Sequence, residues 1–467
     1  MHTHKRRDRF RGALPGALLL AVCLTAVWPA AGGAQRASRP VTPEQAAAEL
    51  GIDLTQPLSQ DDCIAIALRV HPDIRLAATD LKQAIAGVRI ARAGLWPSVS
   101  ALSSYRVTQQ PTRTAVVGGS VIPVGGGRST AQDNQVVGTL EVYRTGREQQ
   151  IDQSRQYSRA ARESYADAQR RLAYYIAQAY YDRLAAERLV TVNEDSETAA
   201  QGHVDLVQAQ IDADDAAPVD IHRVRTELYQ SRLALSSARN QAAIARATLW
   251  SALGEPAAPI EIIDVWQEPA PLPGLDECVV AAFQSRPDLA ATQAGVKAAR
   301  RGLELARLAR RPQLHLDGMA EYGRHNGQSG TSWSVYGTLS QSIFDGGVNS
   351  AGVDQARAQL HAAKANLERL EQAIRLGVET AWLSLRQSAE SIAAAEAAQT
   401  EARVSLDSAE ERYAANVGIL LEITDAQATA TGADVSVVRA HYDYNTALAD
   451  LEQAMGAPLP RVLPADE

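Results

Sequence analysis

The sequence predicts an α+β fold in which two tandem repeats each combine a pair of β-strands with unusually long α-helices. Three observations predict it: motifs recur in the same order along the chain, alternating apolar and polar residues mark strands at matched places, and heptads mark helices on the order of 100 Å long. The composition agrees, because the 467 residues include only 3 Phe, 3 Met and 6 Trp, too few for a large aromatic-filled core.

The N-terminus has the pattern of a secretory signal peptide. A basic start is followed by an apolar run over about 13–31 and by small residues at 32–34, which is the order found in such leaders. We expect cleavage after Ala34; the alternative is a retained membrane anchor. Cys23 follows Val22 rather than a small residue, which disfavours lipidation. Removal of the leader would lower the formal net charge from −8 to about −12, which argues against nucleic acid as a partner.

Motifs in the first half of the chain recur in the second half. Residues 61–63 (Asp-Asp-Cys) and 72–73 (Pro-Asp) match 276–278 (Asp-Glu-Cys) and 287–288 (Pro-Asp) at an offset of 215. Gly138-Thr139-Leu140 matches Gly337-Thr338-Leu339 at 199, and Ala179-Tyr180 matches Ala381-Trp382 at 202. Because the offset falls from 215 to 199, the first repeat should carry about 16 extra residues in one loop.

Each repeat is expected to hold the same elements in the same order: a helix, two strands, a very long helix and a shorter return helix. The expected helices cover about 60–95 and 276–310, about 147–213 and 348–415, and about 218–255 and 420–456. The alternation of Leu314 to Tyr322 marks a first strand, and the second strands cover about 134–144 and 333–344. The organisation is therefore a leader at 1–34, an N-terminal segment at 35–60, repeats at 61–257 and 276–457, a linker at 258–275 and a tail at 458–467.

The long helix of the second repeat carries a heptad pattern. Val353, Leu360, Leu367 and Ile374 fall seven apart, and the complementary positions are mostly small: Ala356, Ala363, Leu370 and Gly377. This is coiled-coil patterning, and the shortage of bulky apolar residues favours a hollow helical wall over a solid core. A filamentous coiled coil would explain the heptads but not the strands at two matched sites.

With these elements in place, residues 60–457 resemble the TolC-like outer membrane efflux protein family. The resemblance rests on Ala-Arg-Ala-Gly-Leu-Trp-Pro at 91–97, on Ile-Phe-Asp-Gly-Gly at 343–347 and on the run at 421–427; the first repeat departs from it at 142–146, where Val-Tyr-Arg-Thr-Gly stands. It implies an α+β membrane protein in which long coiled-coil hairpins continue a transmembrane β-barrel shared by a trimer. Physical reasoning agrees, because four strands alone would leave open edges that lipid does not tolerate.

The resemblance also implies a function. It implies an outer-membrane exit channel that extends into the periplasm and serves a tripartite efflux or type I secretion system. The implied partners are two further copies of the chain, outer-membrane lipid, a periplasmic adaptor protein and an inner-membrane pump that supplies the energy.

The sequence offers little support for other classes of protein. It contains no phosphate-binding Gly-rich motif and no His-Glu-x-x-His, so we expect no catalytic site, no cofactor and no metal site. The alternatives are a periplasmic coiled-coil adaptor, a structural scaffold and an enzyme. An adaptor would have one hairpin beside β-rich domains, not two hairpins with matched strand pairs.

Alternation divides the strand residues into two expected faces. Ser100, Glu141, His315, Asp317 and Glu321 should face the lumen, and His315 is expected to be a polar pore residue rather than a metal ligand. The residues expected to face lipid are Val99, Ala101, Gly138, Leu140, Leu314, Leu316, Gly318, Ala320, Gly337 and Leu339. Tyr105, Tyr143, Tyr322 and Trp333 should lie near the membrane interfaces, and the loop at about 108–133 should lie outside the cell.

The breaks between the long and return helices are the candidate periplasmic mouth. The family usually has Gly at these breaks, whereas this chain has Asp214 and Asn416, which also tolerate a left-handed backbone. Glu422 and Asp425 lie three apart and share one helix face. The resemblance assigns them to an acidic ring around the closed aperture.

The offset of 202 places Asp220 and Arg223 at the equivalent positions of the first repeat. We expect Arg223 to pair with an acid of a neighbouring hairpin and to hold the mouth shut. The alternative is that Glu422 and Asp425 merely favour a helix N-terminus.

Cys63 and Cys278 are repeat equivalents on the apolar sides of their helices. Export would normally suggest a disulfide, but equivalent positions around a tube stay farther apart than the roughly 7 Å that a disulfide can bridge. We therefore expect two free, buried thiols.

Overall fold

The computed structural model describes residues 41–111, 113–124, 126–213, 217–254, 260–326, 328–415 and 417–456. The chain divides into two units, Met1–Thr42 and Pro43–Glu467, and all the elements below belong to the second. The predicted leader and the predicted tail lie outside the described residues.

Each repeat begins with two helices where the sequence predicted one. After the short α2 (Pro43–Leu50), α3 (Gln60–Val70) and α4 (Pro72–Ala93) meet at His71, whose backbone is extended (φ −61°, ψ 133°). Arg286 separates α7 (Leu275–Ser285) from α8 (Pro287–Leu308) in the same way. The residue before a proline avoids the helical region, whereas proline suits the first position of a new helix. The prediction of single helices over 60–95 and 276–310 was therefore wrong at these two prolines.

Four strands form one antiparallel sheet in the order β1–β4–β5–β6. They are β1 (Ser98–Gln110), β4 (Gly127–Arg144), β5 (Gln313–His325) and β6 (Gln328–Ser340). β1 and β6 are the edges of this sheet. β6 ends at Ser340 rather than near 344, because Ser340 is paired with Gln313, the first residue of β5. Beyond it, the Asp345 carboxylate accepts hydrogen bonds from the backbone N–H groups of Gly347 and Asn349 at the start of the next helix.

The extra residues of the first repeat form a β-hairpin rather than the predicted loop. β2 (Arg113–Val117) pairs with β3 (Ser120–Val124) across Gly118 and Gly119, whose φ angles are 61° and 85°. Two consecutive residues with positive φ are what a type I′ hairpin turn requires. The β1–β4 ladder also extends to the Gln110–Gly127 pair. The prediction of a loop over 108–133 was therefore wrong, because most of these residues pair in the two ladders.

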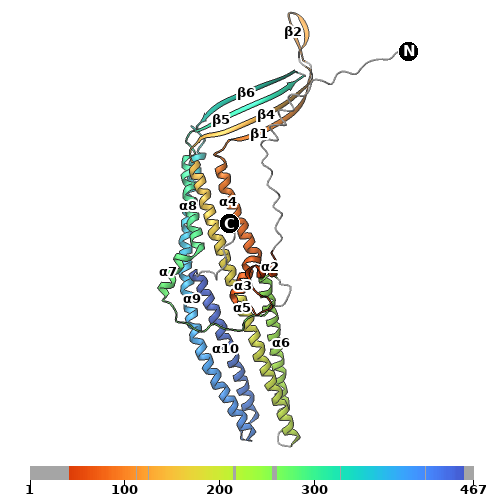
Figure 1. Cartoon of the computed structure of the whole chain (residues 1–467), viewed down its shortest axis with the longest axis vertical. Coiled ribbons are helices and arrows are strands. Elements are labelled where there is room, and N and C mark those ends of the chain that lie inside the picture. Colours follow the sequence, from red (N-terminus) through yellow and green to blue (C-terminus); the bar gives the residue numbers. More distant parts are fainter. Residues whose placement is uncertain are drawn as a thin grey trace, which may run out of the picture. The chain divides into compact units, whose positions relative to one another are not determined.

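Each strand of the sheet is joined to one helix, so the helices keep the order of the strands (Figure 1). α4 leads into β1, β4 into α5 (Arg147–Asp212), α8 into β5, and β6 into α9 (Val348–Ala414). Side by side, α4 packs on α5, α5 on α8, and α8 on α9. The return helices α6 (Asp220–Ala252) and α10 (Leu420–Met455) pack on α5 and α9 and complete two hairpins.

The apolar heptad residues of α9 face the neighbouring helices. Among the described helices, none is long and apolar enough to cross a membrane. The heptad positions of α9 lie on its less exposed side, as predicted: Ala356 and Ile374 are buried, and Leu360 and Leu367 are half-buried. Ile374 belongs to a core cluster formed by α7, α8, α9 and α10.

The linker between the repeats is held to both hairpins by hydrogen bonds. The Tyr180 hydroxyl of α5 donates to the Ile263 carbonyl at 2.8 Å, and the repeat-equivalent Trp382 Nε1 of α9 donates to the Pro273 carbonyl at 2.9 Å. Arg183 of α5 is buried, and its guanidinium donates to the Ile260 carbonyl at 2.7 Å. A buried guanidinium is tolerated only with such partners, so these bonds fix the linker to the helices.

Cys63 and Cys278 are both buried free thiols, as predicted. Burial raises the pKa of the Cys63 thiol to about 12, so it stays protonated at neutral pH and packs as a small apolar residue.

Candidate functional site

The far ends of the two hairpins are joined by a small apolar cluster. Leu420, the first residue of α10, packs among residues of the other hairpin: Val207 of α5 and Ile221 and Val224 of α6. A second cluster, Ala409, Ile423 and Ala426, holds α9 and α10 together at the same end. The ends of the hairpins are therefore packed against each other within one chain.

Tyr413 of α9 adds a polar link between the hairpins. Its hydroxyl donates to Gln210 Oε1 of α5 at 2.5 Å. Burial raises the pKa of Tyr413, and the negative charge of Asp220 raises it further, so the hydroxyl remains a donor at neutral pH. No local spacing in the sequence marks Tyr413, because its partner lies in the other repeat.

Gly418 shapes the turn between α9 and α10. The backbone N–H groups of Val417 and Gly418 both donate to the Arg412 carbonyl at 2.9 Å. A Cβ at Gly418 would lie 3.0 Å from the backbone nitrogen of Tyr413, so a larger residue would force the turn to move. Asp214 and Asn416, the predicted turn residues, lie outside the described residues.

Two of the four predicted aperture residues lie near the start of α10. Glu422 is in the first turn of the helix, and its Oε2 lies 3.5 Å from Arg412 Nη1 of α9. Asp425 is exposed three residues farther on, on the same face of the helix. Within the chain, Glu422 therefore forms an ion pair with Arg412 of its own hairpin.

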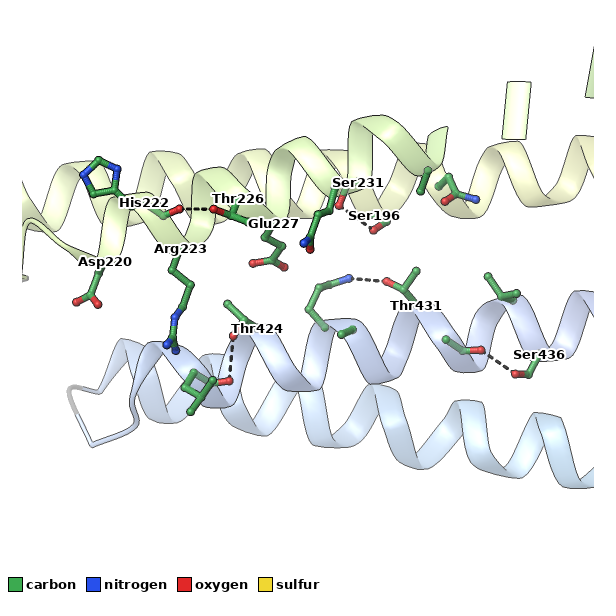
Figure 2. Close-up of a pocket in the computed structure, with 18 of the residues that line it drawn as sticks. Ser196, Asp220, His222, Arg223, Thr226, Glu227, Ser231, Thr424, Thr431 and Ser436 are labelled. Atoms are coloured by element: carbon green, nitrogen blue, oxygen red, sulfur yellow. Dashed lines mark hydrogen bonds between the residues drawn. The ribbon is translucent and has the colours of Figure 1, made fainter. Parts of the chain in front are cut away.

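Asp220 and Arg223, the other two predicted aperture residues, line a groove between α6 and α10 with a volume of about 1090 Å³. Asp220 and Arg223 extend from α6 toward α10, where Thr424 lies (Figure 2). Glu422 and Asp425 are not among the residues that line this groove, so the chain brings the predicted residues together in two pairs rather than in one cluster. Arg223 has no ion-pair partner among the described residues, and its charge is free to meet an acid on another molecule.

A buried histidine–glutamate pair borders the same groove. His203 of α5 is 7% exposed, and its Nδ1 lies 3.6 Å from Oε1 of Glu227, which lines the groove from α6. No spacing in the sequence marks this pair, because it depends on the register between α5 and α6. Among the described residues, no group of three side chains is placed to hold a metal ion.

The register of the sheet puts the predicted lumen residues on one face. Glu141 is paired with His315, Asp317 with Thr139 and Tyr336, and Glu321 with Gln135 and Ser332; paired residues share a face, as do residues two apart. The residues predicted to face lipid share the other face, as the ladders Val99–Gly138–Gly318–Val335 and Leu140–Leu316–Gly337 illustrate. The grouping follows the predicted alternation; which face lines the lumen stays a prediction.

Comparisons with known proteins agree with this architecture. Residues 63–255 and 279–457 match the family model described as outer membrane efflux protein. The chain is 23% identical over 308 residues to the outer membrane efflux protein BepC of Brucella suis, covering 64% of this chain and 66% of BepC. It is 20% identical to the outer membrane protein TolC of Vibrio cholerae over 82% of this chain and 87% of that protein. The structure of the outer membrane protein VceC of Vibrio cholerae matches with a TM-score of 0.74 at 16% identity, covering 86% of this chain and 97% of VceC, which shows the same fold.

Proposed function

The chain belongs to the outer membrane efflux protein family, and on that premise we propose how it serves as an outer-membrane exit channel: three copies enclose one passive duct. The sheet of each copy supplies one third of a closed transmembrane wall, which is the barrel expected from the sequence. The paired long helices continue this wall into the periplasm.

The observation that carries the proposal is the exposed apolar face of the sheet. Val99, Trp333, Val335 and Leu339 share this face and are 62–81% exposed. Exposure of so large an apolar surface to water is unfavourable, whereas its contact with lipid is favourable. The edges β1 and β6 demand a partner as well, because unpaired backbone groups are costly in lipid. Closure by further copies satisfies both needs.

The partners follow from the passive character of the duct. An inner-membrane pump and a periplasmic adaptor supply energy and select the cargo, and the ends of the hairpins meet them from the periplasmic side. Glu422 and Asp425 ring the aperture there, and Arg223 meets an acid of a neighbouring hairpin. The leader at 1–34 directs export and is removed after Ala34; the mass of the mature N-terminus tests that step.

Two adjacent residues of β6 allow a matched test. Val335 lies on the apolar face and Ser334 on the opposite one. Val335→Arg should block assembly of heat-resistant trimers in the outer membrane, because arginine at the lipid midplane costs about 2–4 kcal/mol. Ser334→Arg should assemble and should conduct ions in planar bilayers. Equal assembly of the two variants, or a wild-type protein without conductance, would contradict the proposal.

A further inference from the structure

The charged residues of the four-stranded sheet are divided between its two faces. All the acids of β1, β4, β5 and β6 share the face predicted to line the lumen: Asp133, Glu141, Asp317 and Glu321. Arg128 and Arg324 lie on the opposite, apolar face, because an even number of residues separates them from Gly138 and Leu314 on their own strands. Among the described strand residues, the apolar face therefore carries positive charge and no acid.

Neither Arg128 nor Arg324 is neutralised within the described part of the chain. Both residues are exposed, and neither forms an ion pair there, whereas Arg144 of the opposite face lies 3.7 Å from Glu141. Their partners in the ladders are neutral: Arg128 is paired with Gln109, and Arg324 with Gln132 and Ser329. Their charges are thus free to meet an anion outside the protein.

Aromatic side chains of the same face mark the level of these arginines. Tyr105 and Arg324 are both paired with Gln132, and Tyr322 precedes Arg324 by two residues. Tyr105, Tyr322 and Trp333 are all exposed. Exposed aromatic residues on the lipid side of a barrel lie where the acyl chains meet the headgroups. The arginines therefore lie at this border or beyond it.

The length of β5 agrees with this placement. Arg324 lies ten residues beyond Leu314 on β5, which is about 34 Å along a strand. At the tilt of about 40° found in outer-membrane barrels, this distance spans about 26 Å across the membrane, close to the height of about 25 Å of the apolar band in such barrels. Arg128 lies four residues beyond Gln132 on β4, which adds about 10 Å. Both arginines then reach the headgroups of the outer leaflet.

We infer that Arg128 and Arg324 bind the phosphate groups of a lipid in the outer leaflet, whose acyl chains cover the apolar face below them. A guanidinium donates paired hydrogen bonds to a phosphate, and no acid on this face repels the anion. A lipid fits better than a free phosphate ion, because only the lipid also covers the apolar surface. The inference rests on the proposed function, since it places the apolar face in the membrane and the long helices in the periplasm; it adds the class of lipid.

Binding of lipid A, a glycolipid with phosphate groups on its sugars, tests the inference in the full-length protein in neutral detergent. Native mass spectrometry counts the bound lipid. Arg128→Gln with Arg324→Gln should weaken binding about tenfold or more, because charge-assisted hydrogen bonds are lost. Arg128→Lys with Arg324→Lys should bind with intermediate affinity, since the charge remains without the planar fork.

Arg106 supplies the matched control. It is paired with Ala131, one residue from the level of Arg324 but on the acidic face of the sheet, so Arg106→Gln should bind lipid A as the wild type does. Lipid A without its phosphate groups should bind equally to the wild type and to the glutamine variant. If the glutamine variant does not assemble, the lysine variant and the dephosphorylated lipid decide.

The outcomes separate this inference from the proposed channel. Equal binding of lipid A to the wild type and to the arginine variants would overturn the inference, as would an equal loss in Arg106→Gln. Equally tight binding of inorganic phosphate would overturn the assignment to a lipid. Trimers that conduct ions but do not prefer the phosphorylated lipid would overturn the inference alone. A wild-type protein that forms no trimers and conducts no ions would overturn both proposals.

Discussion

Arg232 of α6 and Asp434 of α10 occupy equivalent places in the two hairpins, 202 residues apart, and carry opposite charges. Arg232 donates to Glu197 Oε1 at 2.9 Å and to Gln201 Oε1 at 3.3 Å, both on α5. Asp434 accepts from Gln399 at 2.7 Å and from Arg403 at 2.8 Å, the equivalent positions on α9. The duplication has kept this bridge between paired helices while the donor and acceptor exchanged sides.

The first prediction follows from this reversal. Arg232→Asp should destabilise the first hairpin by less than about 1 kcal/mol, because it sets two acids against each other at a half-exposed site. Adding Glu197→Arg restores opposite charges and should recover most of that loss. Thermal unfolding in detergent measures the loss of stability in each variant. If the double variant loses the sum of the two single losses, the bridge contributes through packing and not through charge.

Gly146 and Gly347 support a second prediction. Both have positive φ, but only Gly146 has Leu305 and Leu308 within 4 Å of an added Cβ in the chain. Both alanine variants should lose about 1–2 kcal/mol through backbone strain. Gly146→Ala should lose more, because its methyl group must displace Leu305.

The comparison is made by unfolding the monomeric state, in which the surface at Gly347 is open. Equal losses in the monomer would show that the approach of Leu305 is easily relieved.

A third prediction concerns acid sensitivity. Burial tends to raise the pKa of Asp288, but the guanidinium of Arg286, at 2.6 and 3.0 Å, outweighs it and holds the pKa below its usual 3.8. A lowered folded-state pKa gives stability that is present above the unfolded value and is lost as the pH falls through the folded one. Asp288→Asn should therefore cost about 1–2 kcal/mol at neutral pH, and the difference from wild type should shrink below about pH 3.8.

Asp73 is the matched control for this prediction, since it is the repeat equivalent of Asp288 and its side chain is 78% exposed. Asp73→Asn should change the free energy of unfolding by no more than about 0.5 kcal/mol. Denaturant unfolding at several pH values distinguishes the two positions. A pH-independent loss in Asp288→Asn would assign the effect to packing rather than to the charge.

The elements that depend on local patterning could be predicted from the sequence, whereas contacts that depend on register could not. Heptads and matched motifs located α5 and α9 to within two residues. Alternation correctly placed Glu141 and Asp317 on one face of the sheet and Leu140 and Leu316 on the other. The β2–β3 hairpin was missed although Gly-Gly is typical of a tight turn, because its strands have only 5 residues each and β3 contains Pro123, so alternation does not mark them. Tyr413–Gln210 and His203–Glu227 were missed because only the packing of α5 against α6, and of the two hairpin ends against each other, brings them together.

The last prediction concerns the periplasmic mouth. Glu422 lies in the first turn of α10 beside Arg412, and exposed Asp425 follows on the same face. In the proposed trimer these acids surround the aperture, where they attract cations and oppose Arg223 of a neighbouring hairpin. Glu422→Ala with Asp425→Ala should raise the single-channel conductance or weaken block by multivalent cations, because a ring of negative charge concentrates such ions. Single-channel recording in planar bilayers measures both quantities.

Asp443→Ala is the control for the mouth, because this exposed acid lies on the same helix but 18 residues away, about 27 Å along α10. It should leave conductance and cation block as in the wild type. A helix-terminus role for Glu422 predicts a different outcome: a loss of about 0.3–1 kcal/mol in stability with unchanged conductance. Asp425 lies beyond the first turn, so Asp425→Ala alone separates the two explanations. If trimers of Asp425→Ala and of the double variant both keep wild-type conductance and block, Asp425 does not act at the aperture and Glu422 keeps only its role at the helix start.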